Sequence, residues 1–317
     1  MHTPENKTFR GVGWIALAGA VAWCGLMAVQ PPGWAQGLFL LAPLVAVPLT
    51  LPLFGASAKI QIAFTASAFL LIPAFVLERG VPAAACTVPW LLLCVGLAVV
   101  ECARWRRLDL GRVLTAGYLA VGAGWLLLAR LGARPLGFED VIVQATAVHF
   151  HYAGFVLPVV MRRLADTDNR RLTRWSVWGI LVGVPLVAAG ITLTVWQVHA
   201  LESAATLFLA GACWIAAWQQ AAFAWRCAAS GTRWLLTLSS LSLAAAMLLA
   251  VIYALGQLTG AAWLDIPFML RFHGCAQVFG FALPALAAWH WLEHSYHVGQ
   301  DSARVGHERR GAECCPT

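Results

Sequence analysis

Ten apolar stretches, each about 20 residues long, constrain this sequence more than any other feature. A helix of about 20 mostly apolar residues spans the roughly 30 Å hydrocarbon core of a bilayer. Hydrophobic residues make up 61% of the chain and charged residues only 11%, a composition too apolar for a soluble domain. The stretches cover about residues 11–29, 35–54, 60–77, 81–101, 113–131, 140–162, 174–198, 202–225, 233–257 and 267–291. Because they are apolar on all sides, without the alternation of an outer-membrane barrel, we predict an all-α, polytopic membrane protein with about ten transmembrane helices.

The distribution of basic residues predicts the orientation of the chain. Most of the 21 Lys and Arg residues lie in segments on the same side as the N-terminus, whereas the other side keeps only Arg79, Arg130 and Arg134. By the positive-inside rule, both termini are cytoplasmic and the protein is a multi-pass component of the cell's inner (cytoplasmic) membrane. The net charge of +7 then reflects this topology and contact with anionic membrane lipids, and it does not indicate nucleic acid.

Short loops leave no room for a soluble domain, so we expect a single integral membrane domain over residues 1–317. Buried ionisable side chains are concentrated in its second half. Residues 1–135 are therefore predicted to be mainly scaffold, residues 136–295 to carry a polar site, and residues 296–317 to form a cytoplasmic tail. The first apolar stretch has no small-residue cleavage site after it, which favours a retained helix over a signal peptide. The nine cysteines are scattered without a CxxC pair, as expected of small core residues in a reducing compartment.

The sixth predicted helix contains the run AVHFHYAGF, which places ionisable side chains near the bilayer centre. His149 and His151 are about 200° apart on a regular helix, so they cannot share one face. We expect one of them to point into a site and the other to pack against a neighbour through a hydrogen bond. Tyr152 shares the face of His149. Gly154 and Pro158 follow closely and are expected to loosen the helix, which would let both histidines approach one cavity.

The tenth predicted helix carries a second polar group in LDIPFMLRFHGCAQVFGF. At a rise of about 1.5 Å per residue, Arg271 and His273 lie about 9 Å and 12 Å along the helix from Asp265, at a depth similar to that of His149. We therefore expect Arg271, His273 and His149 to face one another. Arg271 keeps its charge and needs an anionic partner, either a carboxylate near the helix mouths or a substrate group. The side chains expected to contact the substrate are Glu139, Asp140, Gln144, Asp265 and Gln277.

The inner end of the tenth helix contains HWLEHSYH, a third polar cluster. His290, Glu293, His294 and His297 recur at i, i+3, i+4 and i+7 on one helix face, and HWLEH matches the H-x-x-E-H pattern of a zinc peptidase class. Little sequence follows to supply the downstream acidic ligand of such enzymes. Histidines are also favoured at a helix C-terminus, so the pattern favours a solvated helix end over a metal site. Weaker candidates elsewhere, expected mainly to form hydrogen bonds between helices, are Tyr118, Gln219, Gln220 and Tyr253.

Two segments resemble the YndJ-like family of bacterial integral membrane proteins. The first is HFHYAGFVLP at residues 149–158, and the second is the R-x-HG…GF run that includes His273 and Gly280. The resemblance covers about residues 138–292. The family often has Asn four residues after the HG histidine, where this chain has Gln277. The family is uncharacterised and sometimes labelled a transporter. The resemblance therefore implies that the two histidine segments form one site without implying a reaction.

Three function classes follow from the polar side chains. The first is an intramembrane enzyme that isomerises, cyclises or hydrates a lipophilic substrate such as an isoprenoid or polyketide. Histidine can give or take a proton near neutral pH, Tyr152 can relay one, and Arg271 can stabilise an oxyanion. No cofactor is expected, because the sequence has no G-x-G-x-x-G, P-loop or haem-attachment motif.

The second class is a proton-coupled transporter of a small or lipophilic solute. Concentration of the polar residues in one half of the chain favours this class less, because many carriers are built from two symmetric halves. The third class is a haem- or metal-binding membrane protein, in which His273 and either His149 or His151 would be the ligands. In every class the expected surroundings are membrane lipids and a lipophilic or small solute.

Overall fold

The computed structural model describes residues 4–29, 33–104, 109–196, 198–227, 229–261 and 263–294. Within these ranges the chain folds into helices and contains no strand. The elements are α1 (Pro4–Val29), α2 (Trp34–Leu41), η1 (Ala42–Ala46), α3 (Val47–Phe54), α4 (Ala58–Val76), α5 (Val81–Ala85), α6 (Val88–Ala103), α7 (Leu110–Leu131), η3 (Pro135–Gly137), α8 (Asp140–His151), η4 (Tyr152–Val156), α9 (Leu157–Asp168), α10 (Arg171–Leu193), η5 (Thr194–Trp196), α11 (His199–Cys227), α12 (Ser230–Thr259), α13 (Ile266–Phe268), η6 (Met269–His273) and η7 (Ala276–Ala282). The last helix continues through residues 283–294.

Nine helical segments of the described chain are long and apolar enough to cross a membrane, and they coincide with the second to tenth predicted helices. These segments run continuously across short elements, for example from Trp34 to Phe54 and from Ile266 to His294. The first predicted stretch corresponds to α1, whose apolar part, Trp14–Val29, is shorter than the other nine. The prediction of an all-α polytopic membrane protein is confirmed.

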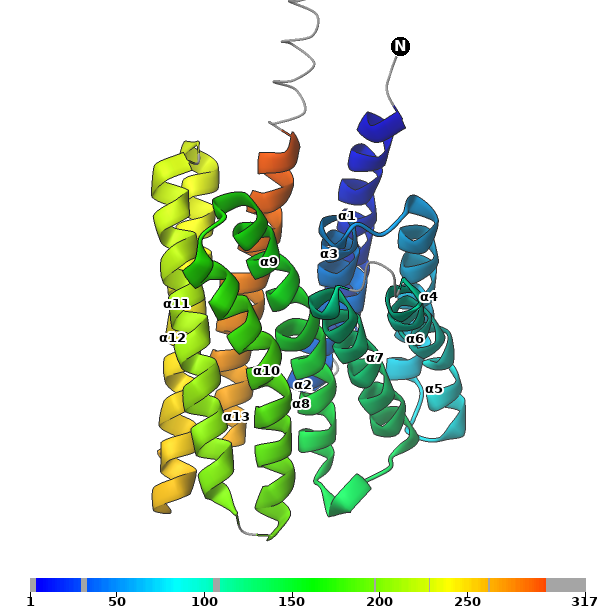
Figure 1. The fold of residues 1–317 in the computed structure, drawn as a ribbon. Coiled ribbons are helices and arrows are strands. Elements are labelled where there is room, and N and C mark those ends of the chain that lie inside the picture. The colour runs from blue at the N-terminus through cyan, green and yellow to red at the C-terminus, as the bar shows by residue number, and fades with distance from the viewer. Residues whose placement is uncertain are drawn as a thin grey trace, which may run out of the picture.

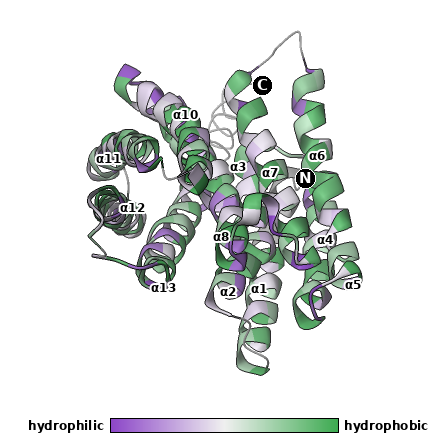
Figure 2. Cartoon of the chain, turned by 90° about the horizontal axis from the view of Figure 1, so that it is seen from below, coloured by the Kyte–Doolittle hydropathy of each residue, from purple (hydrophilic) through white to green (hydrophobic). Residues whose placement is uncertain are grey.

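The helices form one bundle with α2 and α8 near its centre. Figure 2, which looks along the helices, shows α10, α11, α12 and the last helix on one side and α4, α5 and α6 on the other. Many large apolar side chains are exposed on the surface of the bundle, for example Leu92, Trp218 and Leu241, as expected of a surface in contact with lipid. Figure 1 shows α1 beginning, and the last helix ending, at the same end of the bundle. We call this the upper end, and the end that carries η3 the lower end.

Three of the long helices contain a π-helical segment just before a proline. In η1, η4 and η7 the segment ends two residues before Pro48, Pro158 and Pro284, respectively. Proline has no N–H and its ring clashes with the carbonyl four residues earlier. The residue before each proline donates instead to the carbonyl five residues back, as Leu157 does to Tyr152. The expected loosening of the sixth helix near Gly154 and Pro158 therefore takes the form of a π-helical turn.

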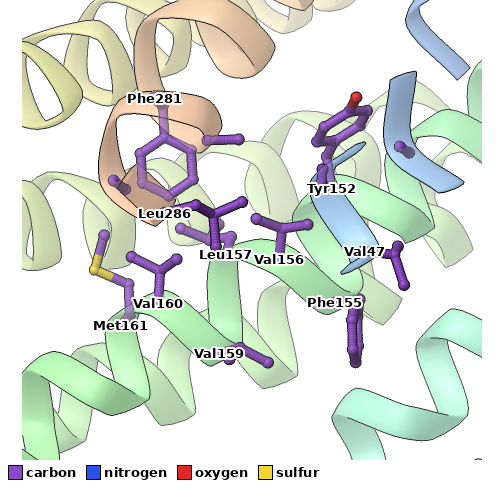
Figure 3. Packing of buried hydrophobic residues seen from close by; sticks show 14 of the residues in the cluster. Val47, Tyr152, Phe155, Val156, Leu157, Val159, Val160, Met161, Phe281 and Leu286 are labelled. Carbon is purple, nitrogen blue, oxygen red and sulfur yellow. The ribbon is translucent and has the colours of Figure 1, made fainter. Parts of the chain in front are cut away.

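Two of these π-helical segments, η4 and η7, contact each other in the core. Figure 3 shows the side chains of Phe281 in η7 and of Val156 and Leu157, at the junction of η4 and α9, in one buried cluster with Val47, the first residue of α3. All four side chains are buried. The π-helical turns of two helices that are distant in sequence thus lie together in the core, and such turns frequently accompany functional sites.

Ion pairs hold the upper end of the bundle together. The sixth predicted helix was expected to end near residue 162, but α9 continues to Asp168, because its charged residues form pairs with neighbouring helices. The Arg162 guanidinium beside Asp109 also holds the pKa of that carboxyl below its usual range. The main pairs are Arg112 with Glu101, Arg162 with Asp109, Arg163 with Glu293 and Arg226 with Asp168.

Candidate functional site

His151 is a fully buried packing residue. The indole Nε1 of Trp90 donates to its Nε2 at 3.1 Å, and its Nδ1 lies 2.7 Å from the carbonyl oxygen of Ala147. Because the indole can only donate and the carbonyl can only accept, the ring must be neutral, with its proton on Nδ1. The ring also fits against Gly122, where an added Cβ would lie 2.7 Å from Nδ1. His151 is therefore the histidine of this helix that packs against its neighbours.

His149 is only half-buried, and its ring is within the range of an electrostatic interaction with His273 of η6. The Nε2 of His149 is buried and has no hydrogen-bond partner in the described part of the chain. On His273, Nδ1 donates to the carbonyl oxygen of Ala246 in α12 at 2.8 Å, so the neutral ring has a free lone pair on Nε2. We call His149 and His273 the histidine pair, and its two members come from the two helices that the sequence predicted to converge.

Helix α2 lies between the two helices that carry the histidine pair. The hydroxyl of Tyr152 donates to the carbonyl of Leu38 at 3.1 Å. The side chain of Leu38 lies so close to Gly274 that an added Cβ would meet its Cδ1 at 2.8 Å. Trp34 at the start of α2 donates to the carbonyl of Leu270 in η6 at 3.1 Å. Tyr152 therefore binds α2, and no hydrogen bond between its hydroxyl and the histidine pair is present in the described residues.

Arg271 lies at the surface. It is exposed, and it forms neither an ion pair nor a hydrogen bond with any described residue. The carboxylates near the helix mouths that the sequence offers as its partners, Asp265, Glu202 and Asp140, have other neighbours, and a Glu202 carboxylate oxygen lies 4.0 Å from Nδ1 of His199. Asp265 caps α13 through the N–H of Phe268 at 2.7 Å. Asp140 pairs with Arg79 and Arg134 at the lower end.

The remaining predicted substrate contacts do not gather around the histidine pair. Glu139 is exposed at the start of α8. Gln144 lines a separate small pocket, described below. Gln277 is half-buried in η7, four residues after His273, and its carboxamide has no hydrogen bond within the described ranges.

The HWLEH segment stabilises the upper end of the bundle. His290 Nε2 donates to the carbonyl of Leu49 in α3 at 2.7 Å, and Glu293 pairs with Arg163. His294 is exposed, and His297 lies outside the described residues. Among the residues that the structure describes, no group of three or more His, Cys, Asp or Glu is placed to hold a metal ion. His290 and Glu293, which the helical spacing places on one face, therefore contact two different helices, α3 and α9, respectively.

Two of the weaker candidates form hydrogen bonds between helices, as predicted. The Tyr118 hydroxyl donates to the carbonyl of Leu181 in α10 at 2.5 Å. Gln220 donates to the hydroxyls of Ser239 and Ser240 in α12 at 3.0 and 3.1 Å. Gln219 and Tyr253 have no hydrogen bond in the described part of the chain.

Sequence reasoning missed Trp90, Ala246 and Arg130. Trp90 and Ala246 fix His151 and His273 from helices that are distant in sequence, and nothing in an apolar run identifies such partners. The distribution of basic residues predicts that Arg130 lies in an outer loop. The structure places it in the last turn of α7, where it is only 4% exposed. The first half of the chain therefore contains a buried cation that the sequence analysis did not predict.

Comparison with known proteins places the chain among membrane proteins. A family model described as YndJ-like protein matches residues 37–281, so the similarity also covers the first half of the bundle. The chain is 28% identical over 309 residues to the uncharacterized membrane protein YndJ of Bacillus subtilis (strain 168). That alignment covers 91% of this chain and 55% of the relative, so the chain spans about half the length of the curated relative. No solved structure matches the chain significantly.

Proposed function

The chain belongs to the YndJ-like family, and we propose that within this family of membrane proteins it is an intramembrane enzyme whose acid-base centre is the histidine pair. The substrate is lipophilic, of the isoprenoid, polyketide or fatty type, and the reaction is an isomerisation, cyclisation or hydration. Because the chain spans about half of the curated relative, this activity is proposed for the bundle itself.

The observation that carries the proposal is the buried, unpartnered Nε2 of His149, on a ring within electrostatic range of His273. A buried polar atom without a hydrogen bond costs about 1–3 kcal/mol. One reason for a protein core to retain such a cost is another task for the atom, such as binding a ligand. By contrast His151, two residues away, has partners for both ring nitrogens. The difference supports a chemical role for His149.

The fixed tautomer of His273 supports a division of roles between the two rings. Since Nδ1 of His273 donates to Ala246, the free Nε2 can accept a proton from a substrate carbon or from water. The protonated form of His149 delivers a proton to a second substrate carbon. After one turnover His273 carries an extra proton and His149 has lost one, and proton exchange with water restores the starting state. No oxidant or cofactor is needed for this sequence.

Arg271 has a secondary role in this proposal. It lies exposed two residues before His273, with its guanidinium free of ion pairs to described residues. A guanidinium at this position suits an anionic or carbonyl group at one end of a substrate whose apolar part reaches the histidine pair.

Comparison of lipophilic metabolites tests the proposal. Extracts are compared between a strain that lacks the gene and the same strain carrying the wild-type chain, His149→Gln, His273→Gln or the control His199→Gln at the lower end. We expect one product with wild type and the control, and its precursor with the other two variants at unchanged protein levels.

Two other results would reject the enzyme. Unchanged metabolites with an altered distribution of a solute across the membrane would indicate transport. A Soret band in the purified wild-type protein that is lost in His273→Gln would indicate haem binding by the pair.

A further inference from the structure

Arg130 is a buried cation without a counter-ion in the described structure. It lies one residue before the end of α7 and is 4% exposed. Its Nη2 donates to the carbonyl of Leu77 at 2.8 Å, and its guanidinium lies 5.0 Å from the centre of the Phe75 ring. The Nε is buried and has no hydrogen bond to a described residue. Arginine remains protonated in proteins, so the charge is not removed by burial.

The acidic residues at this end of the bundle do not neutralise Arg130. Asp140 is shared by Arg79 and Arg134. Glu78 and Glu139 are exposed, and neither forms an ion pair with Arg130. The neighbouring Arg79 adds positive charge, so the local field favours an anion.

A small cavity adjoins Arg130. It has a volume of about 10 Å³ and lies between α2, α4, α7 and α8. Its polar lining consists of Arg130, Gln36 and Gln144, and its apolar lining includes Phe39, Phe75 and Leu126. No carboxylate lines it. Neither glutamine carboxamide has a hydrogen bond to another described residue, so both N–H₂ groups remain available as donors.

We propose that Arg130, Gln36 and Gln144 bind one compact monovalent anion, either a halide or a carboxylate group. A guanidinium and two amide donors in an apolar surround suit such a ligand, because charge-assisted hydrogen bonds are strongest away from water. The present volume is that of about one water molecule, so chloride fits after a small displacement of side chains. A water molecule alone would satisfy Nε and leave the charge uncompensated. The site is separate from the histidine pair and does not depend on the function proposed for it.

Thermal unfolding of the full chain in lipid nanodiscs tests this site. Chloride, bromide, acetate and decanoate are each titrated against gluconate, whose hydroxylated chain is costly to bury among the apolar side chains around the cavity, at constant ionic strength. The expected result is a saturable rise in Tm for the wild type with a halide or with a carboxylate, because a ligand of the folded state stabilises it. A rise with halides identifies an inorganic anion, and a rise with decanoate alone identifies the head group of a lipophilic acid.

Three variants complete the test. Arg130→Gln should abolish the rise, and Gln144→Leu should require a severalfold higher anion concentration for half of it. Arg134→Gln, which removes an exposed charge at the same end, should behave as the wild type. If Arg130→Gln does not fold, the comparison of Gln144→Leu with Arg134→Gln decides. Equal responses of those two variants, or a wild type that responds to no anion beyond gluconate, would overturn the proposal.

Discussion

His149 and His151 are two positions apart and have opposite surroundings. Both nitrogens of His151 are hydrogen-bonded, and Phe39 meets its ring edge-on at a centroid distance of 4.9 Å. The Nε2 of His149 has no partner among the described residues, and its ring interacts electrostatically with His273. The sequence spacing alone predicts that the two histidines differ, and the contacts decide which one is free.

The same substitution at both positions separates the two roles. His151→Phe should lower the free energy of unfolding by about 1–3 kcal/mol, because the buried indole N–H of Trp90 loses its acceptor. His149→Phe removes no hydrogen bond of the described structure, so its effect on stability should be clearly smaller. Denaturant unfolding in detergent measures both. Equal losses would show that His151 is not the structural histidine.

Among the elements, the π-helical segments connect the position of a proline with the direction in which nearby side chains point. Each of η1, η4 and η7 precedes a proline by the same interval, and η4 directly follows the helix that carries His149. A π-helical turn changes the rotation of the chain before it relative to the chain after it. Pro158 thereby influences the direction in which His149 points.

Replacement of Pro158 tests this relation. Pro158→Ala restores an N–H that can donate to Gly154, so we expect η4 to become α-helical and the histidine pair to separate. The protein should remain folded, while formation of the lipophilic product should fall at least about tenfold, since small misplacements of catalytic groups cost large factors in rate. The matched control is Pro185→Ala inside α10, a helix that carries neither histidine. Equal product levels from both variants would exclude a role for the π-helical turn.

The ion pair between Asp109 and Arg162 joins the start of α7 to α9. Asp109 also accepts a hydrogen bond from the N–H of Arg112 at 3.2 Å as the cap of α7. Its pKa is lowered in the folded protein, chiefly by the hydrogen bond from Arg162. Its contribution to stability is therefore complete above the unfolded pKa of about 3.9 and is lost as the pH falls through the lower folded pKa.

This linkage predicts the acid response of a variant. Below about pH 4 the Tm of the wild type should fall with pH more steeply than that of Asp109→Asn, which has no carboxyl to protonate. At neutral pH the variant should be the less stable of the two. Parallel curves for the two proteins across this range would contradict the assigned role of Asp109.

At the scale of the whole molecule, the membrane fold follows from the sequence, but the partners within it do not. Long apolar runs are stable in a bilayer as transmembrane helices, so the membrane-spanning segments were predictable. Arg130 was misplaced because a charge near the end of an apolar run looks like the start of a loop, and only tertiary packing buries it. Trp90 and His151 are 61 positions apart, and helical periodicity carries no information about such a contact. All three prolines that follow a π-helical segment are evident in the sequence, but a change of helix geometry was predicted only near Pro158.

The predicted orientation can be measured with one added cysteine at each end of the bundle. Leu136 and Asn169 are both exposed, so the variants Leu136→Cys and Asn169→Cys each place a thiol at the surface. If both termini are cytoplasmic, a membrane-impermeant thiol reagent added to intact cells should label Leu136→Cys above the background of the parent chain and should label Asn169→Cys only after lysis. The reverse pattern would invert the topology.

Deuterium transfer tests the central claim, the acid-base centre at the histidine pair, most directly. Isomerisation, cyclisation and hydration by this centre all place a solvent proton on carbon. Membranes that contain the wild-type chain, incubated in D₂O, should therefore incorporate deuterium at a carbon of one lipophilic compound, and His149→Gln and His273→Gln should each abolish this incorporation while His199→Gln preserves it. Incorporation that is absent from the wild type, or that persists unchanged in both histidine variants, would contradict the account.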